Sequence, residues 1–216
     1  MNGFALKCIA LLAMLIDHTG AILFPQYLWL RIIGRLAFPI YCYLLIEGYV
    51  HTKSIKKYLL RLGLFAFISE IPFDLAFHSG SFVSGSNVFF TLFLGLLAVY
   101  VCDRLKLKYP DKPYIGYSMF LIAAVLAVFM ATDYDFYGIA LIAVIYIFRQ
   151  KKTAQIILTA FIFSMINWIQ MYGVLAYIPI CLYNGRRGPN SKLLSSLFYW
   201  FYPLHILVLY VISTRI

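Results

Sequence analysis

Apolar runs of about 20 residues recur along this chain of 216 residues, and only short polar gaps separate them. An α-helix needs about 20 mostly apolar residues to cross the hydrocarbon core of a bilayer. Charged residues make up 12% of the chain, against about 25% in a typical soluble domain. The sequence therefore predicts an all-α polytopic membrane protein.

Nine apolar runs are candidate spans, and no gap between them is long enough to hold a second domain. We expect residues 1–216 to form one transmembrane domain, a bundle of about nine helices. The predicted spans are 5–24, 28–50, 57–78, 87–103, 114–131, 135–149, 154–171, 173–184 and 193–213. The eighth run is short, so a bundle of eight spans with a re-entrant segment at 173–184 is the alternative.

Lysine and arginine residues are concentrated in every second gap. Basic residues near the ends of spans mark cytoplasmic loops, which predicts a cytoplasmic N-terminus and an external C-terminus. This placement also accounts for the formal net charge of +10, so no nucleic-acid partner is expected. The basic gaps hold Lys53, Lys56, Lys57 and Arg61, then Arg104, Lys106, Lys108 and Lys112, then Arg149, Lys151 and Lys152, and finally Arg186, Arg187 and Lys192.

Asp17 and His18 stand side by side within the first apolar run. An ionisable side chain at the centre of a bilayer costs roughly 2.5–3.5 kcal/mol on insertion scales, so such residues usually belong to a transport path, a proton relay or a catalytic site. Neighbouring side chains on a helix diverge by about 100°, so these two face different surroundings. We expect Asp17 to pair with Arg31 or Arg35, which share one helix face.

Five polar residues on five predicted spans lie at a similar depth in the membrane. With a rise of about 1.5 Å per residue, this layer lies slightly outside the midplane. A shared depth predicts a polar site in the outer half of the bundle. The residues of the layer are His18, Arg35, Glu70, Asn167 and His205.

Prolines stand close to three of these polar residues. Pro39 follows Arg35 by four residues, Pro72 follows Glu70 and Pro203 precedes His205. Proline removes a helical hydrogen bond, and irregular backbone at membrane depth is tolerated where it lines a cavity. We therefore expect several helices broken at proline, although ordinary kinks beside structural ion pairs are the alternative.

Lys7 precedes His18 by eleven residues, which is about three helical turns. Eleven steps of 100° return to within about 20° of the starting direction, so both side chains lie on one face, about 16 Å apart along the axis. A cation near the cytoplasm and a deep histidine on one stripe suit a long ligand with an anionic head and a reactive tail, such as coenzyme A. A lysine that extends to the membrane surface is the simpler interpretation.

Several motifs, in order, resemble those of one known family. The stretches "MLIDHTGAILFP", "LRIIGRLAFPIYCYLLIEGYVHT", "KKYLLRLGLFAFISEIPFDL", "TDYDFYGIALIAVIYIFR" and "FYWFYPLHILVLYVI" are similar to the TraX family, and the resemblance runs from about residue 5 to 212. Lys7 and His18 also resemble the basic-x10-His signature of a larger superfamily of membrane acyltransferases. The resemblance implies a single transmembrane acyltransferase-like domain in the bacterial cytoplasmic membrane.

The resemblance also implies an activity and its residues. TraX-type proteins are implicated in acetylation of a pilin N-terminus, which would require acetyl-CoA as the donor and an amine or hydroxyl, on a protein N-terminus or a glycan, as the acceptor. His18 is the predicted base, with Asp17 as a charge partner of the arginines and Glu70 as the residue that orients His18 or receives the acceptor. The carry-over from the family is strongest for Asp17, His18, Arg31, Arg35, Glu70 and His205.

Further site residues are predicted from their positions in the sequence. Lys57 and Arg61 are candidates for the phosphates of the donor, although a role in topology or in contact with lipid headgroups is the simpler interpretation. Asp135 is a candidate for a cationic acceptor, although a turn beside an interfacial tyrosine belt is the alternative. The predicted donor-binding residues are Lys7, Arg31, Arg35, Lys57 and Arg61, and the predicted acceptor-side residues are His205, Asn167 and Asp135.

Other functions are compatible with ionisable groups inside a membrane. A secondary transporter or proton-coupled carrier is the main alternative, although such proteins are commonly built from internal repeats, and none is evident here. Bis-histidine haem binding is weaker, because only His18 and His205 share a depth. The four cysteines occur singly within apolar runs, so no metal site is expected.

Overall fold

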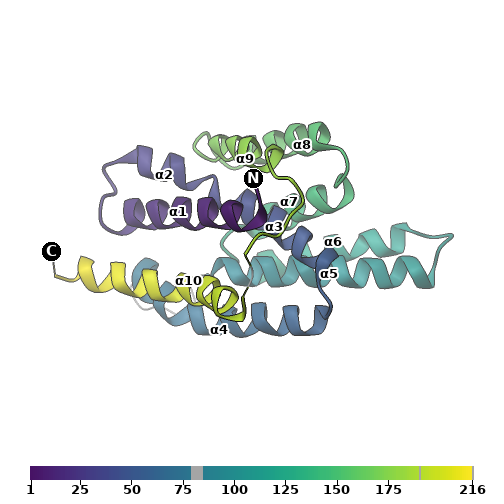
Figure 1. Cartoon of the computed structure of the whole chain (residues 1–216), viewed down its shortest axis with the longest axis horizontal. Coiled ribbons are helices and arrows are strands. Elements are labelled where there is room, and N and C mark those ends of the chain that lie inside the picture. Colours follow the sequence, from purple (N-terminus) through teal and green to yellow (C-terminus); the bar gives the residue numbers. More distant parts are fainter. Residues whose placement is uncertain (79–84, 190, 216) are drawn as a thin grey trace.

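The computed structural model describes residues 1–78, 85–189 and 191–215, and the described residues are almost entirely helical (Figure 1). The helices run back and forth along one common direction and form a bundle. In chain order the elements are α1 (Gly3–Ile22), α2 (Leu28–Gly34), α3 (Ala37–His51), α4 (Ile55–Phe77), α5 (Val88–Lys108), α6 (Tyr114–Phe129), α7 (Asp135–Ile147), α8 (Lys152–Ser164), the 3-10 helix η1 (Gln170–Ala176), α9 (Tyr177–Cys181) and α10 (Lys192–Ser213).

Four helical stretches in the described part of the chain are long and apolar enough to cross a membrane. They are Gly3–Ile22, Leu28–His51, Val88–Lys108 and Leu193–Ser213. Four further apolar helical segments are shorter: Tyr114–Phe129, Asp135–Ile147, Lys152–Ser164 and Gln170–Cys181. The fold is therefore that of a helical membrane protein, while the number of nine spans stays a prediction.

The core of the bundle lies around α3, α5 and α7. Ile40, Leu96 and Ile142, one from each of these helices, are completely buried. Over half of the apolar window of α5 is inside the protein, 56%, against 28% for α1 and α10. Helices α1 and α10 thus lie at the periphery, and each presents most of its surface outward.

The basic gaps of the sequence meet at one end of the bundle, which we call the basic end. The backbone N–H of Gly3 donates to the carbonyl of Arg186 at 2.7 Å, and the Arg187 guanidinium donates to the carbonyl of His51 at 2.9 Å. Arg149 Nε lies 3.8 Å from a carboxylate oxygen of Glu47. These contacts join the N-terminus to three predicted cytoplasmic loops, as the charge pattern requires. The side chain of Lys192 lies outside the described part of the chain.

Two loops without lysine or arginine meet elsewhere in the described part of the chain, residues 85–87 and residues 130–134. There the backbone N–H of Asp133 donates to the carbonyl of Ser86 at 2.8 Å, which joins the loop before α5 to the loop before α7. The alternation of basic and non-basic loops in the sequence is therefore matched by two separate groups of contacting loops.

Only one of the three prolines stands at a helix break. Helix α2 ends at Gly34 and α3 begins at Ala37, and Pro39 occupies the first turn of α3, where a backbone N–H has no helical partner to lose. The expectation of breaks at Pro72 and Pro203 was wrong, since each lies inside a continuous helix. A proline deletes one donor and can kink a long helix, while the hydrogen bonds on either side keep it continuous.

Candidate functional site

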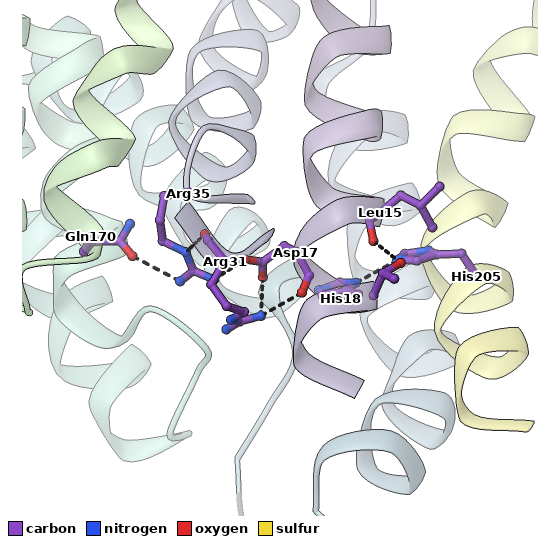
Figure 2. A network of polar contacts seen from close by, with 8 residues as sticks. Leu15, Asp17, His18, Arg31, Arg35, Gln170 and His205 are labelled. Atoms are coloured by element: carbon purple, nitrogen blue, oxygen red, sulfur yellow. Dashed lines mark hydrogen bonds and ion pairs between the residues drawn. The ribbon is translucent and has the colours of Figure 1, made fainter. Parts of the chain in front are cut away.

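His18 on α1 and His205 on α10 form a direct imidazole pair. Nδ1 of His18 lies 2.7 Å from Nε2 of His205, and the two rings are nearly parallel, with 6° between their planes (Figure 2). The residues are 187 positions apart in the chain, so the fold itself creates the pair. His205 is 7% exposed and His18 is half-buried.

Hydrogen bonding assigns the protons of this pair. Nδ1 of His205 lies 2.6 Å from the carbonyl oxygen of Phe201, which can only accept, so this nitrogen carries the hydrogen. In a neutral imidazole the other nitrogen then accepts, so Nε2 of His205 receives the hydrogen bond from Nδ1–H of His18. It follows that Nε2 of neutral His18 holds an unprotonated lone pair, and no described residue hydrogen-bonds to it.

Aromatic rings surround the pair. Phe77 of α4 and Tyr202 of α10 meet the His18 ring edge-on, with centroids 5.6 and 5.8 Å away. His205 also borders an apolar groove of about 570 Å³ between α1 and α10, whose other lining side chains include Leu11, Phe198 and Leu204. The imidazoles therefore lie in a weakly polar setting beside a surface that faces outward from the bundle.

Asp17 points away from His18 and holds two arginines (Figure 2). Arg31 donates to Oδ2 of Asp17 at 2.7 Å and to its carbonyl oxygen at 3.0 Å. Arg35 donates to Oδ1 at 2.5 Å and, with another nitrogen, to Gln170 of η1 at 3.2 Å. The predicted pairing of Asp17 with Arg31 or Arg35 is confirmed, and it includes both residues at once.

This cluster of Asp17, Arg31 and Arg35 carries one more positive than negative charge. The exposed fractions of the three side chains are 12%, 30% and 14%, so water screens Arg31 most. Asp133, in the loop before α7, also interacts electrostatically with both arginines but forms no direct ion pair with them. The positive charge of the cluster is therefore partly compensated, and what remains attracts a further anion. The arrangement suits a ligand or reaction intermediate that develops negative charge.

Helices α1 and α2 approach closely because Gly34 has no side chain. A Cβ atom at Gly34 would lie 2.0 Å from Oδ1 and 2.2 Å from Cβ of Asp17. At Gly20, a Cβ atom would lie 2.7 Å from Cβ of Leu30. The carboxylate of Asp17 reaches the two guanidinium groups because it lies directly over the backbone of Gly34.

Glu70 does not contact His18, so its predicted role as the residue that orients His18 was wrong. Its Oε2 accepts hydrogen bonds from the backbone N–H of Asn87, at 3.1 Å, and from the Asn87 side chain. Asn87 is also the N-cap of α5. The carboxylate therefore joins α4 to the start of α5, and His205 takes the position beside His18 instead.

Lys7 and His18 lie on one face of α1, as the eleven-residue spacing predicts. Nζ of Lys7 lies 5.5 Å from the ring centroid of Phe198, which is seven residues before His205 on α10. Lys57 is exposed at the start of α4, and Arg61 lies over the rings of Tyr58 and Tyr199 at 5.8 and 5.9 Å. Lys7 and Arg61 thus contact neighbouring rings of α10, those of Phe198 and Tyr199.

The predicted acceptor-side residues are separated in the structure. His205 lies at the imidazole pair, whereas Asn167 is exposed and accepts from the backbone N–H of Gln170 at 2.8 Å. Asp135 begins α7 in a left-handed conformation, with φ of 43°. Among the described residues, neither side chain joins the network of Figure 2.

Two polar features of the site were missed at the level of sequence. Gln170 bonds Arg35 and stands three residues from Asn167, so the depth argument that selected Asn167 extends to it. Asp74 is fully buried, and its Oδ1 lies 3.1 Å from Nδ1 of His78 one helical turn later. The i, i+4 spacing of Asp74 and His78 was the available signal.

Two relatives are similar to this chain in sequence, over different shares of its length. The chain is 29% identical over 242 residues to a probable fimbrial assembly protein FimC of Dichelobacter nodosus, covering 96% of this chain and 94% of that protein. It is 33% identical over 95 residues to an uncharacterised protein of Rickettsia prowazekii, covering 44% of this chain and 35% of the relative.

No solved structure matches this chain. The model of the TraX protein family matches residues 2–213, which include the imidazole pair and the arginine cluster. The chain therefore belongs to the TraX family.

Proposed function

We propose that this protein is an acyl-CoA-dependent membrane acetyltransferase that delivers an acetyl group to an amine or hydroxyl at the outer half of the bacterial cytoplasmic membrane. The observation that carries the proposal is the free Nε2 lone pair of His18, whose tautomer is fixed by the hydrogen bond to His205. The neighbouring residue on the same helix turn, Asp17, binds the two arginines of the cluster. A base and a surplus positive charge are the two elements that acyl transfer requires.

His18 is the proposed general base. As the acceptor amine attacks the thioester carbon, Nε2 of His18 takes the proton of the amine. The carbonyl π electrons move to oxygen and form a tetrahedral oxyanion. When this intermediate collapses, the carbon–sulfur bond breaks, and the thiolate of coenzyme A takes the proton from His18, which restores the neutral pair. His205 accepts the Nδ1 hydrogen bond throughout and holds the ring in the required tautomer.

Arg31 and Arg35 are proposed to stabilise the oxyanion. Asp17 binds both guanidinium groups, and Asp133 interacts with them electrostatically without a direct ion pair. The positive charge that remains is proposed to meet the developing negative charge. Such preorganised positive groups act most strongly where water is scarce. Arg31, the more exposed of the two, is the one we expect to meet the reacting group.

The acceptor is proposed to be the N-terminal amine of a pilin-like protein. The support is the membership of the TraX family and the relative named as a probable fimbrial assembly protein. A nine-span bundle with a cytoplasmic N-terminus would place the basic end toward cytoplasmic acetyl-CoA and His18 in the outer half of the membrane.

The experiment is transfer of labelled acetyl groups from acetyl-CoA to a peptide with a free N-terminus, catalysed by purified protein in nanodiscs. We expect His18→Ala to lower kcat/KM by about 10²- to 10⁴-fold, the usual contribution of a general base. His51→Gln, at the exposed basic end, is the matched control and should retain activity. Equal activity of wild type and His18→Ala would reject the proposal.

A further inference from the structure

A second concave site lies at the basic end, between the ends of α3, α5, α6 and α7. Its volume is about 510 Å³, and its walls mix aromatic rings with charged side chains. Ligand pockets in proteins typically have volumes of about 300–1,000 Å³, so this one can hold a molecule of nucleotide size. The residues that matter below are Tyr49, Asp103, Lys106, Tyr117, Tyr146 and Arg149.

Among the described residues, Asp103 supplies the one carboxylate of the pocket lining, and both of its oxygens are already hydrogen-bonded. Oδ2 of Asp103 accepts from the hydroxyl of Tyr49 at 2.6 Å, and Oδ1 accepts from the hydroxyl of Tyr146. Both oxygens are thus occupied by neutral donors from α3 and α7. Asp103 fixes the positions of two tyrosine rings, and its charge is not shared with a cation through direct contact.

Lys106 supplies a cation that is linked to the carboxylate of Asp103 only indirectly, through the hydroxyl of Tyr146. Its Nζ lies 3.9 Å from the ring centroid of Tyr117 and 3.3 Å from the hydroxyl of Tyr146. Within the described residues, no carboxylate oxygen lies within 4.0 Å of this ammonium group. The tyrosine rings hold the ammonium group in place, and this leaves an anion as its natural further partner.

The balance of charge around the pocket is positive. Lys106, Arg149 and Lys151 line it together with one acid, Asp103, which gives the lining a net charge of +2. Arg149 meets Glu47 only through Nε, at 3.8 Å. The pocket therefore combines a lining of positive net charge with aromatic side chains.

We propose that this pocket binds a nucleotide, with its phosphates at Lys106 and Arg149 and its base against the tyrosine rings. Lysine and arginine bind phosphate oxygens through charge-assisted hydrogen bonds, and aromatic side chains stack on bases of any sequence. An anionic lipid headgroup shares the phosphate but has no flat ring to use the aromatic walls. The two tyrosines fixed by Asp103 are the reason to prefer the nucleotide.

This site is distinct from the imidazole pair. Helix α3 begins at Ala37, two residues after Arg35 of the cluster, and rises by about 18 Å from there to Tyr49, at about 1.5 Å per residue. Binding at the pocket is therefore measurable without any turnover at His18, so the inference succeeds or fails independently of the proposed acetyltransferase activity.

Calorimetric titration of purified full-length protein in phosphatidylcholine nanodiscs tests the site, with ADP, coenzyme A and inorganic phosphate as separate ligands. We expect ADP and coenzyme A to bind and Lys106→Gln to raise their Kd at least tenfold. Lys108→Gln is the matched control, because Lys108 is exposed on the same helix and does not line the pocket. Tyr117→Leu should weaken ADP and leave phosphate unchanged, and it remains informative if Lys106→Gln does not fold.

Repeating the titration in nanodiscs that contain phosphatidylglycerol distinguishes the source of the phosphate. Unchanged nucleotide affinity supports a site for soluble ligands. Absence of ADP and coenzyme A binding in phosphatidylcholine nanodiscs would overturn the proposal, and so would equal affinity of wild type and Lys106→Gln. Loss of nucleotide binding in the anionic nanodiscs would show a lipid headgroup site and also overturn it.

Discussion

Nδ1 of His18 and Nε2 of His205 lie 2.7 Å apart, and the second nitrogen of His205 is fixed by the carbonyl of Phe201. The pair is thus a short chain of hydrogen bonds that begins at a free imidazole nitrogen and ends at the backbone. In many enzymes a carboxylate holds the basic histidine in place. The hydrogen-bond partner of His18 is instead a second imidazole, which avoids burying another charge beside the arginine cluster.

His205 is expected to act as a positioning residue. His205→Ala removes the acceptor of the His18 hydrogen bond and should lower kcat/KM about fivefold, since such a bond contributes on the order of 1 kcal/mol. His205→Gln offers an amide oxygen at a similar distance and should restore most of the loss. Steady-state acetyl transfer measures both variants, and equal loss in the two would contradict a hydrogen-bonding role.

Substitution of Arg31 is expected to lower activity, whereas substitution of Asp17 is expected to lower stability. Arg31→Gln leaves Asp17 and Arg35 as a one-to-one pair, so the protein should fold while kcat falls by about 10²-fold, as for loss of an oxyanion donor. Asp17→Asn leaves two sheltered arginines without their carboxylate and should destabilise the protein by about 3–5 kcal/mol. Thermal unfolding and activity of both variants test this. A stable, active Asp17→Asn protein would be inconsistent with the cluster.

Gly34→Ala should disturb the cluster through volume alone. The added methyl group would overlap the Asp17 side chain, and overpacking of this kind costs about 1–3 kcal/mol. Gly63→Ala is the matched control, because its Cβ would meet a Phe93 ring atom at an ordinary 3.4 Å. A drop in Tm for Gly34→Ala and none for Gly63→Ala is the expected result, measured by a thermal scan in detergent.

Glu70→Gln should affect folding more than catalysis. Glu70 bonds Asn87 and has no contact with the imidazole pair, so the dependence of kcat/KM on pH should match wild type. The free energy of unfolding should fall by about 1–3 kcal/mol, because hydrogen bonds to a charged group are lost. A shifted pH profile with unchanged stability would restore Glu70 as a partner of His18.

Single cysteines introduced at residues 133 and 187 should label from opposite sides of the membrane. Asp133 and Arg187 are exposed residues at the two ends of the bundle, and the basic residues predict that 187 is cytoplasmic. Labelling of intact cells with an impermeant maleimide, in a background without the four native cysteines, should modify position 133 alone. The reverse pattern would invert the topology.

Part of the site could be predicted because it depends on geometry within one helix. The turn of about 100° per residue separates Asp17 from His18 and places Lys7 on the face of His18, and the contacts with the arginines and with α10 confirm both inferences. The prediction that the basic loops lie together at one end of the bundle likewise required only the charge pattern. These features are local, so the sequence contains them directly.

The partners contributed by distant helices could not be predicted in the same way. Depth placed Glu70 and His205 in one layer, but only the packing of α4, α5 and α10 decides which of them meets His18. The carboxylate of Glu70 accepts a hydrogen bond from Asn87 instead. Asn87 is the N-cap of α5, so its position depends on where that helix begins. Pro72 and Pro203 were misjudged because a missing donor interrupts one hydrogen bond, and the packing of the whole helix decides whether it continues.

The close approach of Asp17 to Gly34 has an evolutionary consequence. With a Cβ atom excluded at Gly34, the sizes of the side chains at these two positions cannot change independently. A family member with a larger residue at the position of Gly34 should have lost the acid that corresponds to Asp17, and with it the reason to keep two arginines. Covariation of these four positions among homologues would therefore distinguish proteins that retain the cluster from those that have abandoned its chemistry.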